Sequence, residues 1–117
     1  MSATQDYVAL DWIKGEITQT LERAQYALEA VAEAPEDKSH LRLCLTAIHE
    51  AHGTLKMVEL EGPTQVAAEM EALAQALMNG ASPDKARAQE ILMQVILQMP
   101  NYLDRIQREQ KDSPDFV

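Results

Sequence analysis

The chain has 117 residues, of which 46% are hydrophobic and only 4% aromatic, and its formal net charge is −9. This length suits a single domain over residues 1–117, and the apolar fraction is far too high for a disordered chain. The negative charge argues against binding to nucleic acid or to an anionic membrane surface, because both attract basic proteins. A core poor in aromatic side chains favours packed helices over β-sheets.

The expected cellular location follows from the ends of the chain and from its apolar runs. Residues 2–6 are polar and do not resemble a secretion signal, and the longest apolar runs are far too short to span a membrane. The single cysteine, Cys44, cannot form a disulfide within the chain. We therefore expect a cytoplasmic protein that does not contact a membrane.

The first predicted helix covers about residues 6–34. Its apolar residues recur every three or four positions, which places them on one helix face. This face comprises Leu10, Ile13, Ile17, Leu21, Ala24, Leu28 and Val31. Pro35 and the polar residues after it are predicted to end the helix. Tyr7 and Trp12 are expected to pack at one end of the fold.

The second predicted helix begins near Asp37 or Ser39, either of which can cap it, and continues to Leu60. Its apolar face comprises Leu41, Cys44, Ile48, Ala51, Leu55 and Val58. Gly62–Pro63 is predicted to separate it from a third helix, since proline suits a first helical turn. The third helix is predicted to end at Asn79–Gly80, a pair typical of helix C-termini. Its buried face comprises Val66, Met70, Leu73 and Leu77.

The fourth predicted helix starts after Ser82, which is expected to cap it, with Pro83 and Asp84 in the first turn. Its apolar face comprises Ala88, Leu92, Val95, Met99, Leu103 and Ile106. Pro100 removes a backbone donor, so we expect the helix to be kinked or broken there. Residues 110–117 are polar and are expected to form a tail or linker.

Four helices with short connections and one apolar face each predict an all-α fold, an antiparallel up-down-up-down four-helix bundle with its core in about residues 6–109. The apolar faces are narrow enough to be covered within one bundle, so we expect a monomer. Met57, Met70 and Met99 have the spacing of the apolar faces and are expected to fill the core.

The most informative segment is HEAHGTLKMVELEG, residues 49–62. His49 follows an apolar position, so its ring is expected at the border of the buried face, in contact with water. Gly53 lies one turn further along the same face, flanked by His52 and Lys56. Glycine inside a helix costs ~1 kcal/mol relative to alanine. The bare backbone beside the ring therefore indicates a point of close approach for a partner protein.

This segment resembles the histidine phosphotransfer (Hpt) family, whose members are four-helix bundles with a phosphorylatable histidine on the second helix. The family motif is a histidine, a lysine or arginine three positions on, a glycine four on and a small residue five on. A basic or small residue commonly follows, before an apolar pair and two further glycines. The matching residues are His49, Gly53, Thr54, Lys56, Met57, Val58 and Gly62. Two residues depart from the motif: His52 stands at the lysine position, and Glu59 stands where a glycine is common.

The resemblance is closest to one subgroup, through DYVALDWIKGEI at residues 6–17 and HGTLKMVELEG at residues 52–62. Both segments look like the N-terminal Hpt-like module of ChpA or PilL, the CheA-type histidine kinases of type IV pilus chemosensory systems. FimL, a related stand-alone protein, has similar segments. The resemblance spans residues 6 to about 105.

The resemblance implies a phosphotransfer module in a chemosensory phosphorelay that controls pilus motility. His49 would be the phosphoacceptor, exchanging a phosphoryl group with the aspartate of a response-regulator receiver, and Gly53 would give access. His52 and Lys56 would stabilise the added negative charge. The implied partners are a CheY-like receiver domain and the kinase catalytic domain of the same longer chain. The module would need no cofactor or metal of its own, because Mg²⁺ and the acidic pocket belong to the receiver.

Two other interpretations stay open. The chain could be a degenerate Hpt-like domain that docks a receiver or pilus-regulatory partner without being phosphorylated. A metal-binding bundle is less favoured, because His49 and His52 are three positions apart rather than four and no third ligand is evident. Glu50 and His40 are interpreted as surface residues. If His52 supplies the positive charge, transfer is predicted to weaken as the pH rises and its ring becomes neutral.

Overall fold

The computed structural model describes residues 3–112 of the chain, and side chains within residues 11–109. This part forms four α-helices and no strand: α1 (Ala3–Glu33), α2 (Lys38–Met57), α3 (Glu61–Met78) and α4 (Lys85–Asp112). The predicted all-α fold with four helices is confirmed. In the described range none of these helices has the length and apolar character needed to cross a membrane.

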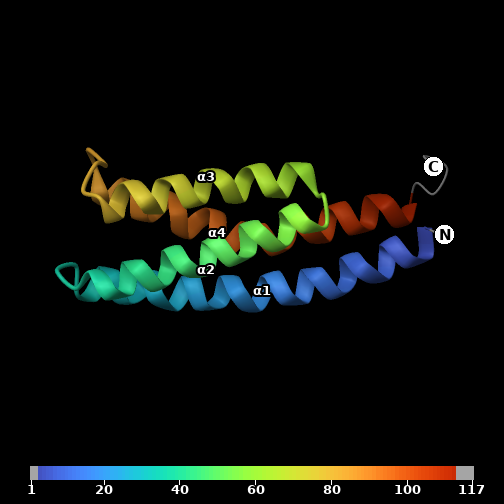
Figure 1. The fold of residues 1–117 in the computed structure, drawn as a ribbon, viewed down its shortest axis with the longest axis horizontal. Coiled ribbons are helices and arrows are strands. Elements are labelled where there is room, and N and C mark those ends of the chain that lie inside the picture. Colours follow the sequence, from blue (N-terminus) through green and yellow to red (C-terminus); the bar gives the residue numbers. More distant parts are fainter. Residues whose placement is uncertain (1–2, 113–117) are drawn as a thin grey trace.

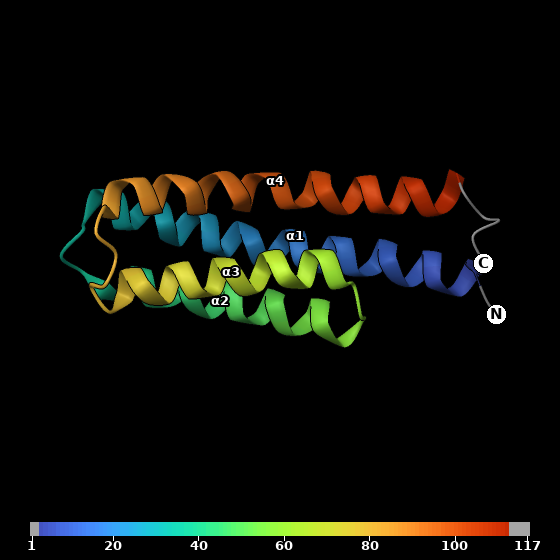
Figure 2. The same ribbon diagram turned by 90° about the horizontal axis from the view of Figure 1, so that it is seen from above.

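The four helices lie side by side along one long axis, and the structure measures 51 × 22 × 19 Å (Figure 1). Helices α1 and α3 each pack against both α2 and α4, so all four surround a common core. The α1–α2 and α3–α4 connections lie at one end of the bundle. The α2–α3 connection lies at the opposite ends of α2 and α3 (Figures 1 and 2). Helices α1 and α4 are longer than α2 and α3 and extend past that last connection (Figure 2).

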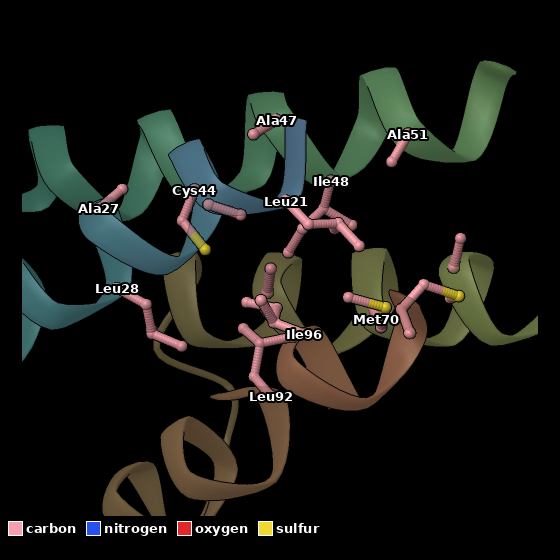
Figure 3. Packing of buried hydrophobic residues seen from close by; sticks show 14 of the residues in the cluster. Leu21, Ala27, Leu28, Cys44, Ala47, Ile48, Ala51, Met70, Leu92 and Ile96 are labelled. Carbon is pink, nitrogen blue, oxygen red and sulfur yellow. The ribbon is translucent and has the colours of Figure 1, made fainter. Parts of the chain in front are cut away.

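The core is formed where the predicted apolar faces meet. The described part of the first face is buried from Ile13 to Val31, and so is the second face except for Val58. On the third and fourth faces only part of the predicted core is buried, namely Met70, Leu77, Ala88, Leu92, Met99 and Leu103. The other predicted positions on these faces are partly buried: Val66, Leu73, Val95 and Ile106. Figure 3 shows Leu21, Ile48, Met70 and Ile96, one from each helix, converging in this core.

The N-termini of α2 and α4 decide one open alternative and correct one prediction. Oδ1 of Asp37 accepts a hydrogen bond from the backbone N–H of Ser39 at 3.0 Å, so Asp37 rather than Ser39 caps α2. At α4, Oδ1 of Asp84 accepts from the N–H of Arg87 at 3.1 Å. The cap of α4 is therefore Asp84, and the prediction that Ser82 fills this role was wrong.

Helix α2 ends at Met57, three residues before the predicted end. The backbone turns there because Glu59 adopts a left-handed conformation with φ 61°, and the N–H of Leu60 donates back to the carbonyl of Leu55 at 3.3 Å. Met57 is consequently 83% exposed, and Val58 lies at the surface, so the prediction that both pack in the core was wrong. Gly80 closes α3 by the same geometry with φ 70°, as predicted.

Two further expectations differ from the structure. Helix α4 continues through Pro100, so the expected break is absent there; the buried Met99 and Leu103 on either side hold both halves against the same core. Trp12 is 63% exposed rather than packed, because one position before the buried Ile13 is a rotation of about 100° around the helix. The side chains of Tyr7 and Leu10 and the structure of residues 113–117 lie outside the described part.

Candidate functional site

His49 lies in the second half of α2, and its side chain is 70% exposed. The preceding residue, Ile48, is fully buried, so the helical rotation of about 100° per residue carries the imidazole from the core to the surface. The exposed position expected from the sequence is therefore what the structure shows. A partner can reach this ring without any rearrangement of the bundle.

Glu71 on α3 holds this ring from the neighbouring helix. Its Oε2 lies 2.7 Å from Nδ1 of His49, and its Oε1 lies 2.8 Å from Nδ1 of His52. The side chains of Glu71 and His52 are 27% and 25% exposed, so both are more enclosed than His49. We call these three residues the site cluster: one carboxylate that bridges two imidazoles.

The charge of Glu71 determines which nitrogen of His49 is available. Partial burial on its own would raise the pKa of Glu71, but hydrogen bonds from His52 and His49, and attraction to both rings, outweigh it. The pKa of Glu71 consequently lies below its ordinary value, and near neutral pH the group is a carboxylate, which only accepts hydrogen bonds. Nδ1 of each ring must therefore carry the proton, which leaves the lone pair of a neutral His49 on Nε2.

Gly53 and Lys56 lie beyond His49 on the same side of α2. Gly53 is exposed, and a Cβ atom built there would meet no atom within 4 Å. Packing inside the bundle therefore does not require a glycine at this position. Lys56 is exposed in the last turn of α2, and none of the ion pairs among side chains 11–109 involves it. Its charge is thus available on the face of α2 that carries His49.

The other candidate residues lie away from the site cluster. Glu50 forms an ion pair with Arg23 of α1 at 2.8 Å, which confirms that it lies on a solvated face. His40 is in the first turn of α2, 3.6 Å from Asp37. The Cys44 thiol is fully buried, and burial raises its pKa to about 12, so it offers no thiolate near neutral pH.

The sequence interpretation missed Glu71. A signal for it was present, because Glu71 follows the buried Met70 just as His49 follows the buried Ile48, so the rule that placed His49 at the border of the core applies to Glu71 as well. The partnership itself depends on how α2 and α3 are aligned, which helical spacing within one element does not report. Over the described side chains, no three His, Cys, Asp or Glu residues are close enough to hold a metal ion.

The fold and site together define a class of protein: a four-helix domain that presents one exposed histidine, held at Nδ1 by a carboxylate from the adjacent helix. Comparison with known families makes the assignment more specific. Residues 6–117 match the model of the FimL C-terminal domain, and the chain belongs to that family.

A curated relative agrees with this assignment. The scaffold protein FimL of Pseudomonas aeruginosa is 23% identical over 109 residues, which cover 93% of this chain and 19% of that protein. The chain thus spans about a fifth of the length of the relative. No solved structure matches it significantly. The relation to FimL expected from the sequence is confirmed, whereas the Hpt assignment and the closer likeness to a kinase module stay predictions.

Proposed function

We propose that the chain is a phosphotransfer module whose His49 exchanges a phosphoryl group with a receiver aspartate, in the regulation of type IV pili. The observation that carries this proposal is the geometry of His49: a ring 70% exposed, fixed at Nδ1 by Glu71 at 2.7 Å, with Nε2 left as the nucleophilic atom. An imidazole that served only the packing of α2 on α3 would not need this exposure.

The reaction places a positive charge on the ring as it proceeds. The lone pair of Nε2 attacks the phosphorus of the receiver's aspartyl phosphate, the P–O bond breaks, and the aspartate leaves as a carboxylate. The proton on Nδ1 stays in the hydrogen bond to Glu71, whose negative charge stabilises the developing imidazolium. Glu71 is thus a positioning residue that selects the tautomer of His49 and offsets its charge.

The surroundings of His49 suit the approach of a partner protein. Gly53 presents bare backbone one turn away, and no contact within the bundle accounts for that glycine. Lys56 supplies a positive charge on the same helix face. Docking on this face would bring the receiver, with its own Mg²⁺, against Nε2 without opening the core.

The proposal includes the setting of the module. We propose that the helices form an antiparallel up-down-up-down bundle like that of the Hpt family, and that residues 1–117 act as one domain in the cytoplasm. The partners that we propose are a CheY-like receiver and a kinase catalytic domain of the same longer chain, as the resemblance to CheA-type kinases implies.

A second candidate function is docking without chemistry. Two observations favour it: the curated relative is named a scaffold protein, and His52 occupies the position at which the Hpt motif has a lysine. In this case the exposed face around His49 binds a receiver or a pilus-regulatory protein, and no phosphoryl group is transferred.

One experiment separates the two candidates. A CheY-like receiver is phosphorylated with radiolabelled acetyl phosphate and Mg²⁺, freed of the donor, and mixed with the chain. Phosphotransfer requires label on the chain that is labile in acid, stable in alkali, and absent from His49→Gln. His40→Gln is the matched control, because His40 lies on the same helix but outside the site cluster. Binding of the receiver without label on His49, for each receiver of the same genome, would refute phosphotransfer and support docking.

A further inference from the structure

The site cluster contains two imidazoles but a single carboxylate. Both oxygens of Glu71 are engaged, one by His49 and one by His52. A lysine at position 52 would bring a charge that persists throughout the neutral pH range, whereas an imidazole titrates within it. The difference from the motif that the sequence resembles is therefore confined to position 52, where a group that can lose its charge stands in place of one that keeps it.

Phosphorylation changes the electrostatic conditions for His52. A phosphoryl group adds a charge of roughly −2 to a site that already holds the Glu71 carboxylate. His52 lies three positions along the helix from His49, ~4.5 Å along its axis, and its ring contacts the same carboxylate. A nearby negative charge favours the protonated form of an imidazole.

We propose that His52 takes up a proton when His49 becomes phosphorylated, so that the cation that neutralises the phosphoryl group is a titratable one. This inference rests on the proposed phosphotransfer function and assigns His52 as a positioning residue that acts through charge. By linkage, a state that binds an extra proton is favoured as the pH falls and loses that advantage as the pH rises. Through His52, phosphorylated His49 is therefore less favoured at pH 8 than at pH 6.

His49 is the other imidazole on the carboxylate, so its own effect on the pH dependence is removed by comparison with a variant that differs only at position 52. The remaining charged groups do not produce the dependence. Helix α2 packs against α1 and α3. From α3, Glu71 contacts the ring; from α1, Arg23 is paired with Glu50, further round the helix. Lys56, one turn along α2, keeps its charge over this pH range, so it adds attraction without adding pH dependence.

The first test follows His52 directly in the unaltered chain. Phosphoramidate is used as a small donor: its P–N bond breaks, a P–Nε2 bond forms on His49, and ammonia leaves. The imidazole of His52 is then titrated by ¹⁵N NMR in the unmodified and the phosphorylated chain. We expect the midpoint of its titration to be about one pH unit higher after phosphorylation, which is a tenfold shift in proton affinity.

The second test compares variants under the same donor. His52→Lys carries a permanent charge, so the ratio of phosphorylated wild type to phosphorylated His52→Lys removes the pH dependence of the donor. The ratio is expected to be near one at pH 6 and about tenfold lower at pH 8. Lys56→Met and His40→Gln are the controls: each should keep the same pH dependence as the wild type.

The outcomes separate this inference from the function on which it rests. Label on His49 with a constant ratio from pH 6 to pH 8, or an unchanged NMR midpoint for His52, would overturn proton uptake and leave phosphotransfer intact. Absence of label on His49 with both phosphoramidate and receiver would overturn both. The NMR titration needs no substitution, so the inference can be decided even if His52→Lys does not fold.

Discussion

Two polar clusters join pairs of helices in this bundle, and they differ in what they leave exposed. The site cluster joins α2 to α3 through Glu71 and its two histidine partners. The second cluster joins α1 to α4: Nζ of Lys14 donates to Asp104 at 3.0 Å and to Gln107 at 2.9 Å. Gln107 in turn donates from Nε2 to Asp11 at 3.1 Å.

The difference lies in how completely Gln107 in one cluster and His49 in the other are used within the chain. In the α1–α4 cluster, both polar atoms of Gln107 are used within the chain and the residue is 7% exposed. In the site cluster, one ring nitrogen of His49 is used and the side chain is 70% exposed. The first arrangement fixes the alignment of two helices, whereas the second also presents a nucleophile to the outside.

Replacing one carboxylate in each cluster should slow phosphotransfer in the site cluster only. In Glu71→Gln, the amide can donate to Nδ1, which favours the tautomer with its proton on Nε2, and no negative charge remains to stabilise the imidazolium. We expect labelling of His49 to slow about 100-fold. Asp104→Asn in the other cluster should label at the rate of the wild type. The measurement is the time course of label from phosphorylated receiver; a loss below about threefold in Glu71→Gln would remove Glu71 from the mechanism.

For folding stability we expect the reverse: a substitution in the α1–α4 cluster should cost more than one in the site cluster. Gln107→Ala leaves Asp11 without its amide donor and removes one acceptor from Lys14 at a buried position. We expect the free energy of unfolding to fall by about 2 kcal/mol. Glu71→Ala, in a partly exposed cluster, should lower it by less than about 1 kcal/mol. Urea unfolding followed by circular dichroism measures both, and a larger loss for Glu71→Ala would contradict the distinction between the two clusters.

The core was predictable because helical spacing alone decides which residues share a face. From Ile13 to Val31 on α1, the spacing of three and four identified buried positions correctly. The same rule placed His49 at the border of the core, since it needs only the neighbouring residue. The periodicity failed at Met57, because the helix ends there and a rule that assumes a continuing helix then assigns the wrong exposure.

The remaining features depend on alignment between helices or on backbone conformation. Glu71 meets His49 across 22 positions of sequence, and only the packing of α3 on α2 sets that register. Glu59 ends α2 in a left-handed conformation. Glycine or asparagine at this position would have predicted the helix end from the sequence, whereas glutamate does not. The α1–α4 cluster joins residues more than 90 positions apart. No local pattern in the sequence marks such pairs.

An exposed glycine lies within a helix near each of the two clusters, so the two glycines can be compared as a matched pair. A Cβ atom at Gly53, near His49, or at Gly15, near Lys14, would meet no atom within 4 Å. Alanine at either position should therefore raise the free energy of unfolding by up to about 1 kcal/mol. Only Gly53→Ala should slow transfer from a receiver, by about tenfold, because only there does a partner need the bare backbone. Equal transfer rates for the two variants would show that Gly53 is not a point of contact.

The smallest expected effect is on folding stability at acid pH, to which both clusters should contribute in the same way. The hydrogen bond and charge of Lys14 hold the pKa of Asp104 below its ordinary value, and the pKa of Glu71 is lowered as well. A carboxylate whose pKa is lower in the folded state stabilises the fold fully above its ordinary pKa, near 4. That stabilisation is lost as the pH falls through the folded value. The urea midpoint of the wild type should therefore drop between pH 5 and pH 3. The drop should be smaller in both Asp104→Asn and Glu71→Gln, since each variant lacks one of the groups that titrate. A drop as large as that of the wild type in either variant would mean that its carboxylate is not the group protonated on acid unfolding.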